Sequence, residues 1–493
     1  MVKEYRELIK SYFNEHPLGS ENIGSFNNFI EFELQKIVDG IGDIAPTIIP
    51  QNVKSFIVKF KKISIGTPSI IEADGSKRDI TPCEARLRKL TYSAPLFLEI
   101  GVYIDGVQRE SFKCFVGKLP IMVKSKYCHL CNLKREELIA KGEDPDYPGG
   151  YFIINGNERV LIILEDLAPN RLFIEKNDAG DYIGKVFSEG GLYRIPHLID
   201  CTKDGLFYLS FTRFKKVPII AVIKALGLIR DQDIMNAMTE EEDDRVYVNL
   251  YEVSDLRKET DALIYLAGKS GISQDKEVKI DACYDQLDKY LLPHIGTTPN
   301  ERLAKAYNLC KYIGKLLRVT KGQIQSDDKD HYMNKRLRLS GDLLSDLMRV
   351  NLRALVQDIT YNFQRLVKRG KFQSIKIIIR DELLTSNIKS PLATGSWTAG
   401  RKGISQNIDR TNILATMSHL QRVVSLLSST QQNFEARALH PTHWGKLCAV
   451  ETPEGQSIGL RKNLALLCSI TQGDISEEKV KKVLEVCGLK DKK

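Results

Sequence analysis

The sequence has few cysteines, no long apolar run and no signal-peptide core. Ten cysteines in 493 residues are too sparse for a disulfide scaffold, so we expect reduced thiols. No apolar stretch approaches the ~18 residues that a membrane helix needs, because the best candidate, 217–229, is interrupted by Pro218, Lys224 and Gly227. The charged N-terminus resembles no secretory signal. These absences predict a soluble cytoplasmic protein that makes no contact with a membrane.

Motifs of self-sufficient enzymes are missing as well. There is no phosphate-binding loop ending in Gly-Lys-Ser/Thr, no GxGxxG between a strand and a helix, and no GxSxG. No cluster of alternating aspartates could hold two Mg²⁺ ions. Cys128 and Cys131 have the spacing of zinc ligands, but a structural zinc site needs a second such pair, so a buried thiol pair is the preferred interpretation. We therefore predict no catalytic residue and no metal ligand in this chain, and chemistry shared with a partner.

The net charge of +9 is unevenly distributed. Residues 329–380 contain twelve Lys or Arg against four Asp, and residues 391–473 contain eight against four acids. Residues 230–244 hold seven acids and one Arg, including the run Glu240–Asp244. Segregated charge of this kind indicates a polyanionic partner for the basic part. A solvated helix face explains the pattern about equally well.

Sequence patterns divide the first two thirds of the chain into four parts. Residues 1–50 have apolar side chains at helical spacing, and residues 53–123 alternate as strands do. A hairpin over 151–164 is predicted by the turn Asn155-Gly156. Residues 165–325 mix short strands with helices, and we interpret them as a distinct domain inserted between two parts that belong together.

The C-terminal part contains the clearest helical patterns. Residues 327–369 predict one long helix with an apolar face, and 374–379 predict a strand. A second helix is expected over 409–427, with Asp409 as its N-cap. Together these patterns favour an α+β chain of several domains with mixed sheets and helices.

The segment 437–466, RALHPTHWGKLCAVETPEGQSIGLRKNLAL, has the most distinctive composition. His440 and His443 flank a proline, so they lie on a turn and are interpreted mainly as hydrogen-bonded structural residues. The glycines allow close backbone approach, and Arg461 and Lys462 suit phosphates.

This segment resembles the signature of the second-largest subunit of multisubunit DNA-directed RNA polymerases. The segments 81–96 (TPCEARLRKLTYSAPL), 117–128 (GKLPIMVKSKYC), 149–162 (GGYFIINGNERVLI) and 330–344 (DHYMNKRLRLSGDLL) resemble further blocks of that family, in the family's order. Family members are about twice as long. The chain therefore resembles the N-terminal half, called B″, of the subunit that some archaea split into two polypeptides; a truncated piece of an unsplit subunit is the alternative.

The resemblance implies an architecture of protrusion, lobe and fork. The protrusion would comprise 1–165 and 327–390, the lobe 166–326, the fork 391–473, and a C-terminal helix and tail 474–493. It also implies that the catalytic Mg²⁺ is held by another subunit, the largest, and that this chain binds no cofactor alone. The expected partners are the C-terminal half of the second-largest subunit, the largest subunit, template DNA and nascent RNA.

The resemblance further implies the residues that contact nucleic acid. Gln406, His419 and Arg422 would lie beside the nascent RNA, and Arg437 would touch DNA near the downstream edge of the bubble. Further candidates are Lys446, Lys335, Arg336 and Arg338, the last three of which could instead face a partner subunit. From a different class, the alternative function is a stand-alone nucleic-acid-binding module that does not assemble into a polymerase.

Overall fold

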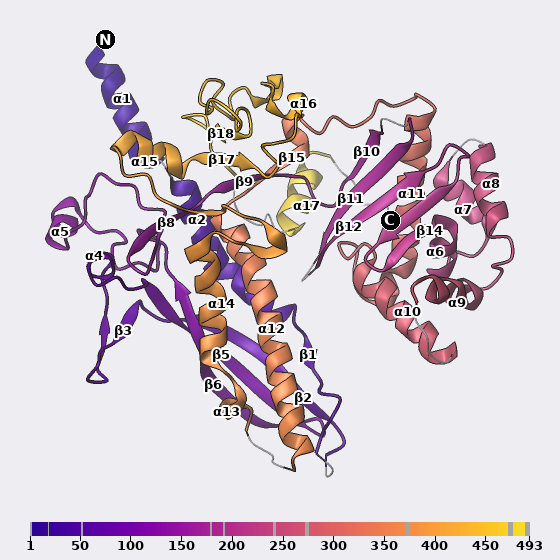
Figure 1. Ribbon diagram of the computed structural model, residues 1–493, viewed down its shortest axis with the longest axis horizontal. Helices are drawn as coiled ribbons and strands as arrows, with labels where there is room; N and C mark the ends of the chain where they lie inside the picture. Colours follow the sequence, from indigo (N-terminus) through magenta and orange to yellow (C-terminus); the bar gives the residue numbers. More distant parts are fainter. Residues whose placement is uncertain are drawn as a thin grey trace. The chain divides into compact units, whose positions relative to one another are not determined.

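The chain folds into two compact units (Figure 1). The structure, a computed structural model, describes all residues except 1, 18, 51–52, 178–179, 191–192, 240–242, 272–275, 371–373, 472–476 and 489–493. The first unit comprises Met1–Asp166 and Leu337–Lys493, and the second unit comprises Leu167–Arg336. Helices and several separate sheets occur together, as expected of an α+β protein.

The first unit begins with helices. They are α1 (Val2–Glu15), α2 (Ser20–Asn28), the π-helical turn η1 (Phe29–Glu33) and α3 (Leu34–Asp39). Phe26, Phe29, Leu34 and Ile37 are buried, so the helical apolar spacing seen in the sequence does form one packed face.

An antiparallel sheet forms the centre of the first unit. Its strands, in the order β1-β2-β5-β6, are β1 (Asp43–Ile44), β2 (Phe56–Ile65), β5 (Ser93–Ile104) and β6 (Val107–Pro120). Asp105 and Gly106 both have positive φ, 53° and 81°, the backbone of the tight turn that joins two twisted strands. The strand and turn predictions for this region are confirmed.

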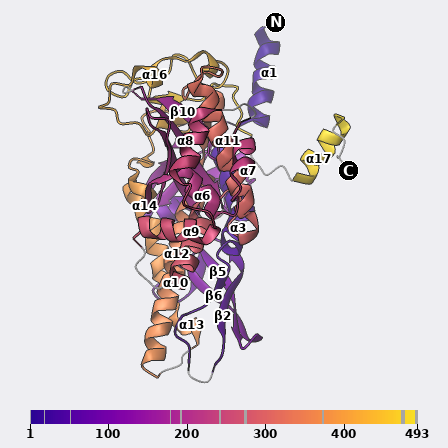
Figure 2. The ribbon, with the colours of Figure 1, turned by 90° about the vertical axis from the view of Figure 1, so that its right-hand side faces the viewer.

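Two helices run along this sheet in both views (Figures 1 and 2). They are α12 (Ser340–Lys368) and α14 (Asp381–Thr394), and α13 (Ile375–Ile378) lies between them in the sequence. Phe363 of α12 stacks on Phe56 of β2, with ring centroids 4.5 Å apart. The predicted apolar face of α12 is buried, but the helix begins at Ser340, not near 327. The strand expected over 374–379 is wrong, because Ile375 and Ile378 are buried at a helical spacing of three.

Short elements connect the sheet to the rest of the first unit. They are β3 (Ser69–Ile71), β4 (Lys77–Asp79), α4 (Pro82–Leu87), α5 (Arg135–Ala140), β7 (Phe152–Ile154), β8 (Asn157–Leu161) and β9 (Ile163–Leu167). β7 and β8 pair across Asn155-Gly156 as predicted.

The second unit is built on an antiparallel meander. Its strands are β10 (Leu172–Lys176), β11 (Tyr182–Gly190), β12 (Tyr193–Cys201), β13 (Phe207–Phe211) and β14 (Phe214–Pro218), paired in that order. Its helices are α6 (Ile219–Ala225), α7 (Asp231–Met238), α8 (Asp244–Glu252), α9 (Glu259–Lys269), α10 (Lys276–Tyr290), η2 (Pro299–Glu301), α11 (Arg302–Thr320) and η3 (Tyr332–Asn334). Every residue of α6 is buried, so this helix lies inside the unit's hydrophobic core.

The second unit extends to Arg336, so residues 327–336 belong to this unit. The Asp327 carboxylate accepts hydrogen bonds from the Ile174 backbone N–H at 3.1 Å and from Lys315 Nζ at 2.6 Å. Strand β15 (Lys335–Arg338) spans the boundary. Of the acidic run, residues 240–242 lie outside the described part. Asp243 is buried and its carboxylate contacts Arg245 and Lys321.

The C-terminal part of the first unit consists mainly of loops and short elements. These are η4 (Thr398–Gly400), β16 (Ser405–Asn407), α15 (Ile413–Leu420), β17 (Arg422–Ser425), α16 (Phe434–Arg437), η5 (Pro441–His443), β18 (Arg461–Asn463) and α17 (Glu477–Val486). None of the helices in the described residues is long and apolar enough to cross a membrane.

The helix expected over 409–427 is wrong at both ends. Asn412 caps α15, accepting the Ala415 N–H at 2.7 Å through its side chain, whereas Asp409 binds Thr411. After Gln421 the chain becomes strand β17, which pairs in parallel with β9 and antiparallel with β18. The β-branched Val423 and Val424 favour a strand, and the pairing partners lie far away in the sequence.

Candidate nucleic-acid interface

Gln406 lies on β16, the edge strand of the three-stranded sheet β16-β8-β7. Its backbone pairs with Val160 of β8. The side-chain amide donates to the Gly403 carbonyl at 3.0 Å, and its oxygen lies 3.3 Å from Nε2 of His419. The half-buried amide is therefore held in one orientation.

His419, at the end of α15, holds this arrangement together. Its Nδ1 accepts the backbone N–H of Asp409 at 3.1 Å, so the proton of the neutral ring lies on Nε2 and can be donated to Gln406. The side chain is only 4% exposed. Burial, and then the charge of Arg422, lower the pKa of His419 to about 4. In this structure His419 is a neutral residue that positions Gln406, and it presents no cation to a phosphate.

Arg422 opens β17 and is half-buried. Burial, followed by the positive charge of Arg461, lowers the pKa of its guanidinium. Arg461 is exposed on the neighbouring strand β18, where it pairs with Val424. Among the described residues no side chain or carbonyl is hydrogen-bonded to either guanidinium. The carboxylates of Asp409 and Glu451 raise the pKa of Arg422 to a lesser extent, and arginines without a bound partner are suited to bind an anion.

Arg461 is not among the residues for which the family resemblance implied a contact with nucleic acid. The sequence showed only a basic pair, Arg461 and Lys462. The structure separates the two, because Lys462 is buried and its Nζ contacts the Glu165 carboxylate at 3.1 and 3.2 Å. Alternation along a strand is the signal that distinguishes them, since neighbouring side chains point to opposite faces.

Arg437 lies at the end of α16, and its guanidinium binds backbone carbonyl groups. Its Nη1 donates to the carbonyls of Gln456 and Ile458 at 2.7 and 3.0 Å. Its Nη2 donates to those of Ser429 and Gln431 at 2.8 and 3.2 Å. These bonds tie the loop 428–438 to the turn 455–459. The two terminal nitrogens of Arg437 thus fix the shape of this loop, and the expected contact of Arg437 with DNA stays a prediction.

Lys446 and the two histidines belong to the turn after α16. Lys446 is exposed, and its backbone bonds to His443 and Ala465. His440 accepts the Thr442 N–H at 3.2 Å through Nδ1, and His443 is buried. His440 is thus hydrogen-bonded within its own turn, as expected, and its structural role stays an interpretation.

The remaining candidates lie around β15. Lys335 Nζ is 3.2 Å from Asp330, and Arg338 is 2.9 Å from Asp346; both side chains are about one-tenth exposed. Arg336 is exposed and donates to the carbonyls of Met333 and Lys335. Of these three, Arg336 alone presents an exposed side chain.

Cys128 and Cys131 lie in a loop of the first unit. Burial raises the pKa of Cys128, and the Tyr92 hydroxyl lies 3.4 Å from its sulfur. In the part of the chain that the structure describes, no group of three or more His, Cys, Asp or Glu side chains is arranged to hold a metal ion.

Two family profiles match the chain. One, described as RNA polymerase beta subunit, matches residues 17–386, and the other, described as RNA polymerase Rpb2, domain 3, matches residues 406–470. DNA-directed RNA polymerase subunit Rpo2N of Methanocaldococcus jannaschii is 43% identical over 496 residues, which are 98% of this chain and 97% of that protein. Subunit Rpo2N of Methanothermobacter thermautotrophicus (strain Delta H) is 40% identical, with 97% of each covered.

Subunit Rpo2 of Saccharolobus shibatae is 42% identical over 494 residues. That match covers 99% of this chain but 43% of the relative, so the chain spans less than half the length of this longer protein. The profile over 17–386 covers most of the chain, and the similarity to the Rpo2N proteins extends along nearly their whole length. The chain therefore belongs to the RNA polymerase beta subunit family.

Proposed function

We propose that the chain is a subunit of a DNA-directed RNA polymerase and forms one wall of the cleft that holds template DNA and nascent RNA. The neighbouring guanidinium groups of Arg422 and Arg461, beside the oriented amide of Gln406, carry the proposal. Arginine and amide groups bind phosphate and sugar without reading base sequence, as a polymerase that transcribes any template requires.

In this proposal the first unit supplies the protrusion and fork, and the second unit supplies the lobe. The partners are the polypeptide that carries the rest of the subunit, the largest subunit, template DNA and nascent RNA, in an assembly that works in the cytoplasm. The Mg²⁺ ions for nucleotidyl transfer are held by another subunit. This chain contributes the binding and orientation of the nucleic acids.

Co-purification tests the assembly. A tagged copy of the chain, purified from its native cells, is expected to bring down the other polymerase subunits in stoichiometric amounts, identified by mass spectrometry. The alternative, a stand-alone nucleic-acid-binding module, predicts nucleic acid without those subunits. Recovery of the chain free of any such assembly would rule out the proposal.

Crosslinking tests the site. A photoreactive residue placed at position 406 of the assembled enzyme is expected to crosslink to RNA in a stalled elongation complex. The same residue at position 213, an exposed turn of the second unit, serves as the control for non-specific labelling. Equal labelling at both positions would contradict the assignment of Gln406.

A further inference from the structure

A cleft of about 420 Å³ opens in the first unit beside the hairpin formed by β3 and β4. Three lysines line it: Lys89 from the turn after α4, Lys118 from β6 and Lys389 from α14. No acidic residue is among the described residues that line it. The cleft has the size of a small-molecule site, and its charge is positive.

The ammonium groups of these lysines are not neutralised. Within the described ranges, none of the three takes part in a hydrogen bond, an ion pair or a cation–π contact through its side chain. The hydroxyls of Ser69 and Thr91 and the side-chain amide of Asn155 lie along the same cleft. Lysines supply three donors each and no acceptor, so the polar lining of the cleft is suited to receive an anion.

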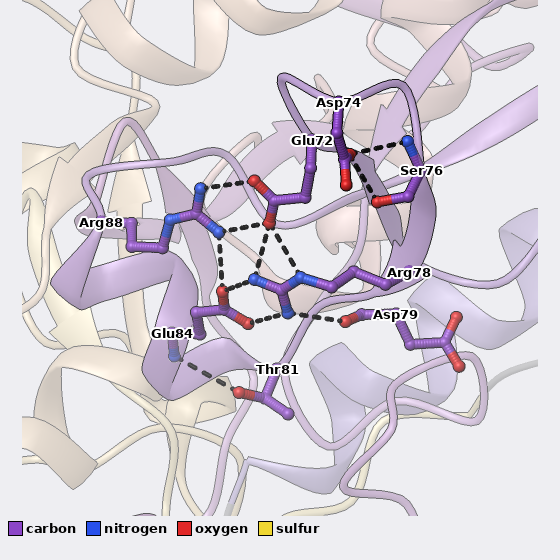
Figure 3. A network of polar contacts seen from close by, with 8 residues as sticks. All are labelled: Glu72, Asp74, Ser76, Arg78, Asp79, Thr81, Glu84 and Arg88. Carbon is purple, nitrogen blue, oxygen red and sulfur yellow. Dashed lines mark hydrogen bonds and ion pairs between the residues drawn. The ribbon is translucent and has the colours of Figure 1, made fainter.

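Glu72 and Glu84, two acidic residues near the hairpin, are bound by arginines (Figure 3). Arg88 Nη1 lies 2.7 Å from Glu72 and 2.8 Å from Glu84, and Arg78 binds both carboxylates as well. These arginines lower the pKa of each glutamate to about 2, Arg88 acting most strongly on Glu72 and Arg78 on Glu84. Two arginines therefore balance these two glutamates. Asp79, which pairs with Ser69 in the hairpin, is 69% exposed and is not among the residues that line the cleft.

Close backbone packing fixes the position from which Lys89 projects. Lys89 has φ 54°, and a Cβ on Gly156 would lie 2.7 Å from its Cα. Two hydrogen bonds reinforce this contact, from Gly156 N–H to the Leu90 carbonyl at 2.9 Å and from Asn155 N–H to Thr91 Oγ1 at 3.1 Å. The turn that carries Lys89 is therefore held against the β7–β8 hairpin.

The other two lysines are placed by the contact between β6 and α14. The Lys118 N–H donates to Thr385 Oγ1 at 3.0 Å, and a Cβ on Gly117 would lie 3.1 Å from that same oxygen. Lys389 follows Thr385 by four residues, so it lies on the same face of α14. The cleft is thus bordered by cations from three elements that pack directly against their neighbours.

Apolar side chains supply another part of the lining, the isoleucine wall. Ile70, Ile80, Leu90 and Pro120 line it, and Ile80 is almost completely buried. We propose that this cleft binds a phosphorylated small molecule of nucleotide size, with its phosphates among Lys89, Lys118 and Lys389 and its apolar ring on the isoleucine wall. This binding does not depend on the proposed polymerase assembly, because every lining residue lies in the first unit of this chain.

Calorimetric titration of the full chain tests the proposal, with ADP and pyrophosphate as the probes. Each single change, Lys89→Gln, Lys118→Gln or Lys389→Gln, is expected to weaken ADP binding about tenfold, because each removes a charge-assisted contact. The triple variant is expected to lose binding. The matched control replaces Lys54, Lys62 and Lys77, which are exposed and do not line the cleft, and is expected to bind within about twofold of the unmodified chain.

Three outcomes would contradict the proposed binding of a phosphorylated small molecule. The absence of binding of both probes to the unmodified chain at about 1 mM, or equal binding by the two triple variants, would overturn the proposal. If the cleft variant lost affinity for an RNA oligonucleotide but kept it for ADP, the cleft would be a nucleic-acid track and the proposal would be wrong. As a second readout, ADP is expected to slow amide exchange at 89–91 and 385–389 of the unmodified chain.

Discussion

Lys462 on β18 reaches across β17 to Glu165 on β9, where its Nζ lies 3.1 and 3.2 Å from the two carboxylate oxygens. The two side chains are 9% and 3% exposed. This ion pair joins β9, which follows the β7–β8 hairpin, to β18, which carries Arg461. The two partners are 297 residues apart in the sequence.

The Lys462→Met substitution is expected to destabilise the first unit by about 3–5 kcal/mol, because it leaves a buried carboxylate without a counter-charge. Replacing both residues, Lys462→Met with Glu165→Leu, is expected to cost clearly less. Both tryptophans of the chain, Trp397 and Trp444, lie in the first unit, so their fluorescence during urea unfolding reports this unit.

The exposed pair Lys36–Glu33 supplies the control for this prediction. Lys36→Met is expected to change the free energy of unfolding by less than about 1 kcal/mol, since exposed pairs contribute little. Equal losses for the buried and exposed lysines would contradict the role assigned to burial.

The stability of the first unit is expected to fall as the pH drops from about 6.5 towards 4 because of His419. The ring has a pKa of about 4 when folded, against an ordinary value of 6.5, so between these values the unfolded chain binds a proton that the folded chain does not. The contribution is complete above pH 6.5 and is lost progressively as the pH falls towards 4, by up to about 3 kcal/mol. Urea unfolding at a series of pH values measures it. His419→Gln should flatten this dependence, and a variant that retains the full slope would refute the assignment.

Arg437→Ala is expected to release the loop 428–438 from the turn 455–459. Hydrogen bonds from a charged donor contribute about 1.5–3 kcal/mol each, and Arg437 makes four to backbone carbonyls. Hydrogen exchange is expected to quicken in both segments. Arg437→Lys should not restore protection, because an ammonium cannot reproduce the planar fork. Unchanged exchange in both segments would show that the bonds are dispensable.

Arg422→Ala and Arg461→Ala are each expected to weaken binding of single-stranded RNA and to reduce the slope of log affinity against log salt by about 1. Filter binding over a range of salt concentrations measures both quantities. Arg213→Ala, an exposed arginine of the second unit, is the control. A slope that stays unchanged in both test variants would remove these arginines from the interface.

Local patterns predicted much of the fold. The apolar face of α12, the strands β2, β5 and β6 and the Asn155-Gly156 hairpin are visible in the sequence, because each depends on side-chain periodicity or on turn residues within a few positions. The secondary structure around the candidate site was predicted less well. Residues 422–425 continue a helical pattern in the sequence, yet they form β17, since pairing with β9 and β18 outweighs local preference.

The sequence by itself determined the family of the chain, its mixed helical and strand content and the general region of its basic side chains, since motifs and periodicity are local properties. Only the tertiary structure decided which basic groups remain available. Arg461 is exposed while Lys462 is paired with Glu165, Arg437 is occupied by four carbonyls, and His419 is buried and neutral. The physical reason is that burial and pairing depend on partners tens to hundreds of residues away, which no local pattern specifies.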